Sequence, residues 1–114
     1  MTINNEQNFT VVDRMNAITN ASDIKNTAGQ TLDIIGILTY ETTDKATGEF
    51  KSVGAIKVAD GTIYGFTSAT LIECAEMMCG AFADGAKVIT VETITKKSNA
   101  GRTFYQFKIV DIKN

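Results

Sequence analysis

Residues 31–41 have the sequence TLDIIGILTYE, a run of β-branched and apolar residues with one glycine in its middle. Such side chains favour extended backbone, so the run predicts a strand. Gly36 interrupts it where a glycine permits a bend or a bulge, as happens where a strand curls around a barrel. The stretch therefore predicts the first strand of a curved sheet.

Two further strands are expected directly after it. Residues 42–49 are polar and rich in turn formers, and residues 50–58 return to apolar and β-branched composition. Asp60-Gly61 is the strongest short hairpin signal in the chain, because these residues readily adopt the positive φ angles of a tight turn. Residues 62–66 complete the hairpin. The sequence therefore predicts three strands in meander order.

The periodicity changes in residues 67–82, where the spacing of apolar residues predicts a helix. One helical stripe carries Leu71, Ala75, Met78 and Phe82. Thr70 and Glu73 fit a capping box at the start of this helix. Strand composition returns in residues 87–96 and 102–112, with a polar turn between them.

This order of elements, β-β-β-α-β-β, predicts a mainly-β fold, the OB-fold, which is a five-stranded Greek-key barrel. A plain α+β sandwich is the competing interpretation. We expect residues 25–114 to form the barrel and residues 1–24 to form an N-terminal arm. The polar first nine residues indicate a loose segment. A short helix follows the cap-like Thr10, since apolar residues recur there at helical spacing: Val11, Met15 and Ile18.

The composition is that of an ordinary single globular domain. The chain has 114 residues, of which 44% are hydrophobic and 21% are charged. No apolar run approaches the ~20 residues that a membrane-spanning helix needs. The polar N-terminus shows no secretory signal. We therefore expect one soluble domain in the cytoplasm, without a membrane partner.

The sequence offers no support for catalytic chemistry. It contains no histidine, so the commonest general base is missing, and its glycine-rich stretches lack the lysine of a phosphate-binding loop. Cys74 and Cys79 lie five residues apart on the predicted helix, which turns their side chains about 140° away from each other. We expect free thiols, no metal, no cofactor, and a protein that binds a partner and is not an enzyme.

The charge distribution gives a mixed signal about nucleic acid. A formal net charge of -2 and a pI near 5.0 argue mildly against a protein that coats phosphate backbones. Basic residues nevertheless gather near the C-terminus, with no acid between the first and the last of them. This local positive stripe consists of Lys96, Lys97, Arg102 and Lys108.

Several short motifs resemble those of one protein family. They are Asn16-Ala17-Ile18 with Ala21 and Ile24, Gly29 with Leu32, Thr47-Gly48-Glu49, Asp60-Gly61 with Tyr64 and Ser68, and Gly101-Arg102-Thr103. Over most of its length the chain resembles the small single-stranded DNA-binding proteins of phages and conjugative elements of Gram-positive bacteria. The resemblance implies an OB-fold and a role in phage or plasmid DNA replication or recombination inside a bacterial host cell.

The same resemblance bears on partners. It implies single-stranded DNA as the ligand, and it leaves open replication or recombination proteins and a homo-oligomer as further partners. Many bacterial single-stranded DNA-binding proteins recruit such partners through an acidic tail. Residues 111–114, Asp-Ile-Lys-Asn, do not resemble that tail, so recruitment of this kind is not expected.

A protein that binds single-stranded nucleic acid needs aromatic faces for base stacking beside basic groups that contact phosphates. The final strand offers both, because alternation along a strand separates its side chains into two sets. One set is Arg102, Phe104, Gln106 and Lys108, and the other is Tyr105, Phe107 and Ile109. We expect the first set to bind the ligand and the second to pack in the core. Alternatively, the N-terminal arm covers Phe104.

The second and third strands add further candidates. Lys51 and Lys57 share one face of their strand, where they either join a basic groove or guard a solvated edge. Tyr64 and Phe66 flank Gly65, which leaves room for a base to lie against the sheet, and core packing is the equal alternative. The candidate nucleic-acid-binding residues are Lys51, Lys57, Tyr64, Phe66, Lys96, Lys97, Arg102, Phe104 and Lys108.

Two functional hypotheses from different classes follow. The first is a sequence-tolerant single-stranded DNA-binding protein that acts through base stacking and phosphate contacts. The second is a phage-encoded protein–protein interaction module, an inhibitor or a replisome adaptor on the same barrel, which the acidic pI favours. Steep salt dependence of DNA binding distinguishes the first from the second.

Overall fold

The computed structural model describes all 114 residues. The elements are β1 Thr2–Gln7, α1 Val11–Thr19, β2 Ser22–Asp23, the 3-10 helix η1 Ile24–Thr27, β3 Thr31–Thr43, β4 Phe50–Val58, β5 Ile63–Phe66, α2 Ala69–Ala83, β6 Val88–Lys97 and β7 Thr103–Lys113. The predicted mainly-β class is confirmed. From β3 to β7, three strands, a helix and two strands follow one another in the predicted order.

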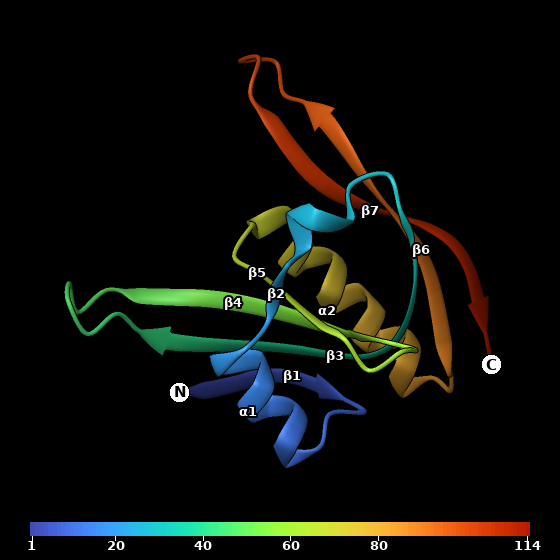
Figure 1. The fold of residues 1–114 in the computed structure, drawn as a ribbon, viewed down its shortest axis with the longest axis horizontal. Coiled ribbons are helices and arrows are strands. Elements are labelled where there is room, and N and C mark those ends of the chain that lie inside the picture. Colours follow the sequence, from blue (N-terminus) through green and yellow to red (C-terminus); the bar gives the residue numbers. More distant parts are fainter.

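The strands form one curved sheet, a half-barrel (Figure 1). Their order across the sheet is β2-β5-β4-β3-β6-β7, and β1 pairs with β3 off this path. No ladder joins β5 to β7. Between these two strands the rings of Phe66 and Phe107 meet edge to face, with their centroids 5.8 Å apart. Side-chain packing therefore bridges the opening that backbone hydrogen bonds leave.

The predicted bend in β3 is confirmed at Gly36. The pairing of β3 with β4 shifts register between Ile34 and Gly36. A Cβ atom at Gly36 would lie 3.0 Å from the backbone oxygens of Gln7 and Asn8, so only glycine lets this connection pass so closely. The bend allows one strand to serve two neighbours along the same edge, β6 over residues 31–34 and β1 over residues 37–41.

Residues 2–7 form strand β1, and the expectation of a loose arm is wrong for them. β1 runs antiparallel to β3 and pairs Thr2 with Glu41 and Gln7 with Ile37. The Asn5 side chain donates to Thr39 Oγ1 over 2.9 Å. The polar composition of residues 2–7 did not indicate a strand. β1 is stabilised by backbone pairing with the open edge of β3 rather than by burial of apolar side chains.

Helix α2 covers the inside of the half-barrel. Its predicted stripe is confirmed, since its four buried residues are Leu71, Ala75, Met78 and Phe82. The predicted capping box is wrong, because Ser68 is the N-cap and its hydroxyl accepts from the Leu71 amide. This side of the sheet holds the main core, a cluster of 15 buried residues.

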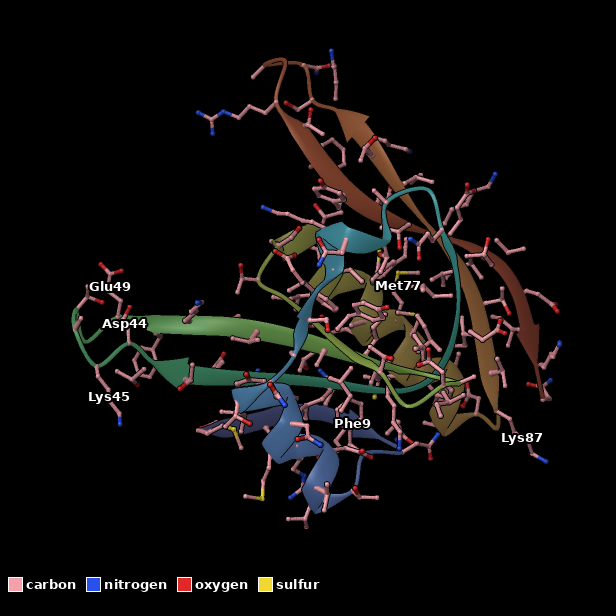
Figure 2. All side chains as sticks on the ribbon, viewed as in Figure 1. Phe9, Asp44, Lys45, Glu49, Met77 and Lys87 are labelled. Atoms are coloured by element: carbon pink, nitrogen blue, oxygen red, sulfur yellow. The ribbon has the colours of Figure 1, made fainter.

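Helix α1 covers the opposite side of the sheet, near β5. Its expected start is confirmed, because Thr10 and Asp13 form a reciprocal capping box. Only Asp13 and Ala17 are buried in this helix. A small core of six buried residues lies beneath it, and Figure 2 shows one of them, Phe9, just before the helix. Neither α1 nor α2 has the length and apolar character needed to cross a membrane.

Candidate nucleic-acid interface

A groove of about 730 Å³ opens between α1 on one side of the sheet and the ends of β5 and β7 on the other. It runs from α1 across β4 and the edge of β5 to the outer end of β7. Aromatic and basic side chains from five different elements line it, and they include Lys25, Tyr40, Lys51, Phe66 and Tyr105. The groove thus combines the two kinds of group that single-stranded nucleic acid requires.

Lys25 reaches the groove because η1 is fastened to β6. The Thr27 hydroxyl donates to the Ile24 carbonyl over 2.7 Å and lies 2.9 Å from Thr93 Oγ1. The Gly29 amide donates to the Thr93 carbonyl over 2.8 Å. These buried contacts hold η1 in place, with Ile24 in the core and Lys25 exposed. The short 3-10 helix gave no periodic signal in the sequence, so this position of Lys25 was not predicted.

Phe66 contributes mainly to the core. Its ring covers Gly54 on the neighbouring strand, where a Cβ atom would lie only 2.2 Å from Phe66 Cε2. Phe66 is 6% exposed, and the half-buried Tyr64 packs against the main core. On the other face, Gly65 approaches Ala21, whose Cβ lies 3.1 Å from the position of an added Cβ. Both Tyr64 and Phe66 therefore contribute to the main core, and Phe66 also lines the groove.

The final strand alternates as the sequence indicates around Phe107, but Ile109, which was also expected in the core, is 45% exposed. Phe107 is 4% exposed and belongs to the main core, whereas Phe104, on the opposite face, is half-buried and pairs with Lys96 of β6. Tyr105 shares the face of Phe107, but it lies nearer the hairpin tip, where the half-barrel opens, and it lines the groove. Alternation alone assigned Tyr105 to the core. Its closeness to the turn at residues 98–102 was the signal that it could be accessible.

The hairpin formed by β6 and β7 carries the positive stripe. It projects away from the rest of the molecule (Figure 1). Its four basic residues, Lys96, Lys97, Arg102 and Lys108, are all exposed. None of them has an ion-pair partner, because the two ion pairs of the protein are Arg14–Glu6 and Lys57–Asp13. The hairpin therefore offers four cationic groups without ion-pair partners, of which Lys108 lies opposite Glu92 in the β6–β7 ladder.

The two lysines predicted on β4 have different surroundings. Lys51 is exposed and lines the groove. Lys57 is half-buried under α1, where its Nζ atom donates to Asp13 Oδ2 over 2.9 Å. The backbone amide of Thr10 and then Lys57 hold the pKa of Asp13 below its usual value, against the effect of burial. Lys57 therefore orients α1 and is not available to a ligand in the groove.

The nine predicted site residues thus fall into separate groups. Lys51 and Phe66 line the groove. The outer face of β6 and β7 carries Lys96, Phe104 and Lys108, and the hairpin tip carries Lys97 and Arg102. Tyr64 and Lys57 make internal contacts. The groove and the hairpin meet at Tyr105, which joins the two surfaces.

The remaining pKa shifts have local structural causes. Hydrogen bonds from Thr62 lower the pKa of Asp60 in the β4–β5 turn, and burial raises the pKa of Tyr40. Cys74 and Cys79 are free and half-buried. No group of three or more cysteine, aspartate or glutamate side chains is placed to hold a metal ion.

No family model, curated protein or solved structure matches the chain.

Proposed function

We propose that this chain is a sequence-tolerant single-stranded DNA-binding protein that acts in phage or plasmid DNA replication or recombination. One observation carries the proposal. Four exposed basic residues without ion-pair partners stand on a projecting hairpin, directly beside a groove that contains Tyr105 and Lys51. Cationic groups without ion-pair partners contact phosphates, and the accessible aromatic residue supports a base.

The topology supports an OB-fold as the framework for this function. The bend at Gly36 and the succession of three strands, a helix and two strands agree with a Greek-key barrel. In this interpretation the barrel would close if β7 paired with the β2–β5 end of the sheet, a ladder that is not formed here. The free edge of β7 carries Tyr105, which lines the groove.

The proposed path of the strand runs from the groove onto the hairpin. Bases lie in the groove against Tyr105, with Lys25 and Lys51 beside the phosphates. The backbone then continues along the hairpin, where Lys97 and Arg102 are exposed. A duplex keeps its bases stacked internally, and the net charge of -2 attracts its phosphates only weakly. Single strands should therefore bind better than duplex.

A fluorescence anisotropy titration with labelled poly-dT, at two salt concentrations, tests the proposal. Arg102→Ala should flatten the salt slope by about 0.7, the effect of one lost phosphate contact on a single strand. Lys87→Ala is the matched control, because Lys87 is also exposed but lies at the opposite end of β6 (Figure 2). Salt-independent binding, or equal affinity for duplex and single strand, would refute the proposal.

Tyr105→Leu separates stacking from phosphate contact. Leucine keeps apolar bulk against the main core but has no ring face, so affinity should fall by about 1–3 kcal/mol while the salt slope is unchanged. Circular dichroism confirms that the variant is folded. Phe104→Leu is the companion variant. If it weakens binding and Tyr105→Leu does not, the strand lies on the outer face of the hairpin, as the sequence suggested, and not in the groove.

The alternative function is a protein–protein interaction module on the same half-barrel. The specific observation that favours it is the group of exposed apolar side chains on α1, which includes Val12, 66% exposed, and Met15, 62% exposed. A module of this kind would show no binding to poly-dT at any salt concentration.

A further inference from the structure

Helix α1 has its apolar side turned to solvent. At about 100° per residue, Val11, Met15 and Ile18 lie together on one side of the helix. They are 65%, 62% and 50% exposed, and Val12 beside them is 66% exposed. The opposite side carries Asp13 and Ala17, the only buried residues of the helix. This arrangement is the reverse of an ordinary amphipathic surface helix.

Polar contacts hold the helix in this orientation. The Asp13 carboxylate accepts from the Thr10 amide and from Lys57 Nζ, at 3.0 and 2.9 Å. Arg14 pairs with Glu6 of β1, which fixes one flank of the helix to the sheet. Rotation of α1 about its axis would leave the half-buried Lys57 without its partner. The exposed apolar face, defined as Val11, Val12, Met15 and Ile18, is therefore a fixed feature of the fold.

We propose that this apolar face packs against the same face of a second copy of the chain. The spacing of Val11, Met15 and Ile18, at i, i+4 and i+7, is that of helices that pack along a shared seam. A two-fold axis then places identical side chains against each other. The two charged side chains of α1, Asp13 and Arg14, are both paired within one copy. Two copies with a net charge of -2 therefore meet without opposed free charges at this surface.

The size of the face sets the strength of the contact. Complete burial of a large apolar side chain removes on the order of 100 Å² from water, and these four are between half and two-thirds exposed. The face is thus on the order of 200–300 Å² per copy, whereas a stable interface needs about 800 Å² per partner. The contact is weak between free molecules and becomes effective where two copies are held close together.

Single-stranded DNA would hold two copies close together, and this step rests on the proposed function. Ile18 belongs to the apolar face and also lines the groove, together with Met1. Copies that occupy neighbouring segments of one strand would therefore have their α1 helices near the shared ligand. Tethering raises the effective concentration to the millimolar range, so the weak contact would appear as cooperative binding.

Sedimentation equilibrium without DNA, over a range of protein concentrations up to about 1 mM, tests the contact itself. Met15→Gln should weaken self-association at least tenfold, because it places a polar group in the seam while helix propensity hardly changes. Met77→Gln is the matched control, since Met77 is 74% exposed on α2 (Figure 2) and should have no effect. Absence of self-association, or equal weakening by both variants, would overturn the inference.

Titration of oligonucleotides that hold one copy or several copies tests its role on DNA. Met15→Gln should bind the short poly-dT with unchanged affinity and lose cooperativity on the long one, and Met77→Gln should retain both. If the chain self-associates through α1 but ignores DNA, the proposed function fails and the contact stands. If DNA binding is normal and wild type and Met15→Gln sediment identically, the contact fails and the proposed function stands.

Discussion

The two sides of the sheet are built in opposite ways. The side under α2 holds 15 buried residues in one cluster, and α2 directs its whole apolar stripe into it. The side under α1 holds six, and α1 contributes only Ala17 to them while its larger apolar residues face solvent. Burial on the α2 side therefore supplies most of the stability. The α1 side leaves its apolar helix face available for contacts, and the groove beside it extends to Phe66, Leu71 and Tyr105 of the other side.

Removing an equivalent side chain from each helix gives the largest expected contrast. Leu71 of α2 is 1% exposed, so Leu71→Ala should lower the free energy of unfolding by about 2–5 kcal/mol, from lost burial and a cavity. Met15→Ala of α1 should change it by less than about 0.5 kcal/mol, as expected for a solvent-exposed position. Urea unfolding followed by circular dichroism measures both. Similar losses for the two variants would mean that α1 is packed against the protein after all.

The two close-packed glycines of the β4–β5 pair provide a second, smaller contrast. Gly54 faces the α2 side, where a Cβ atom would lie 2.2 Å from the Phe66 ring. Gly54→Ala must displace that ring from the core and should cost about 1–3 kcal/mol. Gly65 faces the α1 side, where the atom nearest to an added Cβ is the Ala21 Cβ at 3.1 Å, a tight contact but a much longer one than at Gly54. Gly65→Ala should cost less than Gly54→Ala in the same unfolding assay.

The same comparison explains how far the sequence could be interpreted. The α2 stripe and the strand alternation of residues 31–113 are set by burial, which leaves a clear periodic pattern. Their boundaries were predicted to within two residues. The stripe of α1 has the same helical spacing, and it correctly indicated a helix. Periodicity reports which residues share a side of a helix, but it does not report whether that side faces a core.

The site was harder to predict for a related reason. Alternation placed Phe104 and Phe107 on opposite faces of β7, and the structure agrees. It could not show that Tyr105, which is half-buried against the main core, also lines the groove. Tyr105 reaches the groove because β7 is the last strand of the sheet and has no strand beside it on its free edge. Contacts made by distant backbone segments leave no local pattern in the sequence.

The ion pair beneath α1 is the next point at which the comparison can be tested. Lys57→Met keeps the length of the side chain but leaves the Asp13 carboxylate without its cationic partner. A hydrogen bond to a charged group contributes about 1.5–3 kcal/mol, and the loss should fall at the low end because the Thr10 amide remains. The matched variant is Lys51→Met, since Lys51 is exposed and has no ion pair. It should unfold at the same urea concentration as the wild type.

Acid should weaken the attachment of α1 before it weakens the α2 side. The pKa of Asp13 is lowered in the folded protein from its model-peptide value of 3.8, chiefly by the Thr10 amide and also by Lys57. A carboxyl group with a depressed folded pKa contributes stability that is present above its unfolded pKa and is lost as the pH falls through the folded value. Asp13→Asn removes this contribution at every pH. The difference in urea midpoint between wild type and Asp13→Asn should therefore be constant above about pH 5 and shrink below about pH 4.

Asp60, whose pKa is also lowered, titrates in both proteins and cancels from the difference. Leu71→Ala provides the contrast, because no titratable group is changed and its difference from wild type should persist through the same pH range. If the difference in urea midpoint between wild type and Asp13→Asn did not shrink in acid, the carboxylate charge of Asp13 would not be what holds α1 in place.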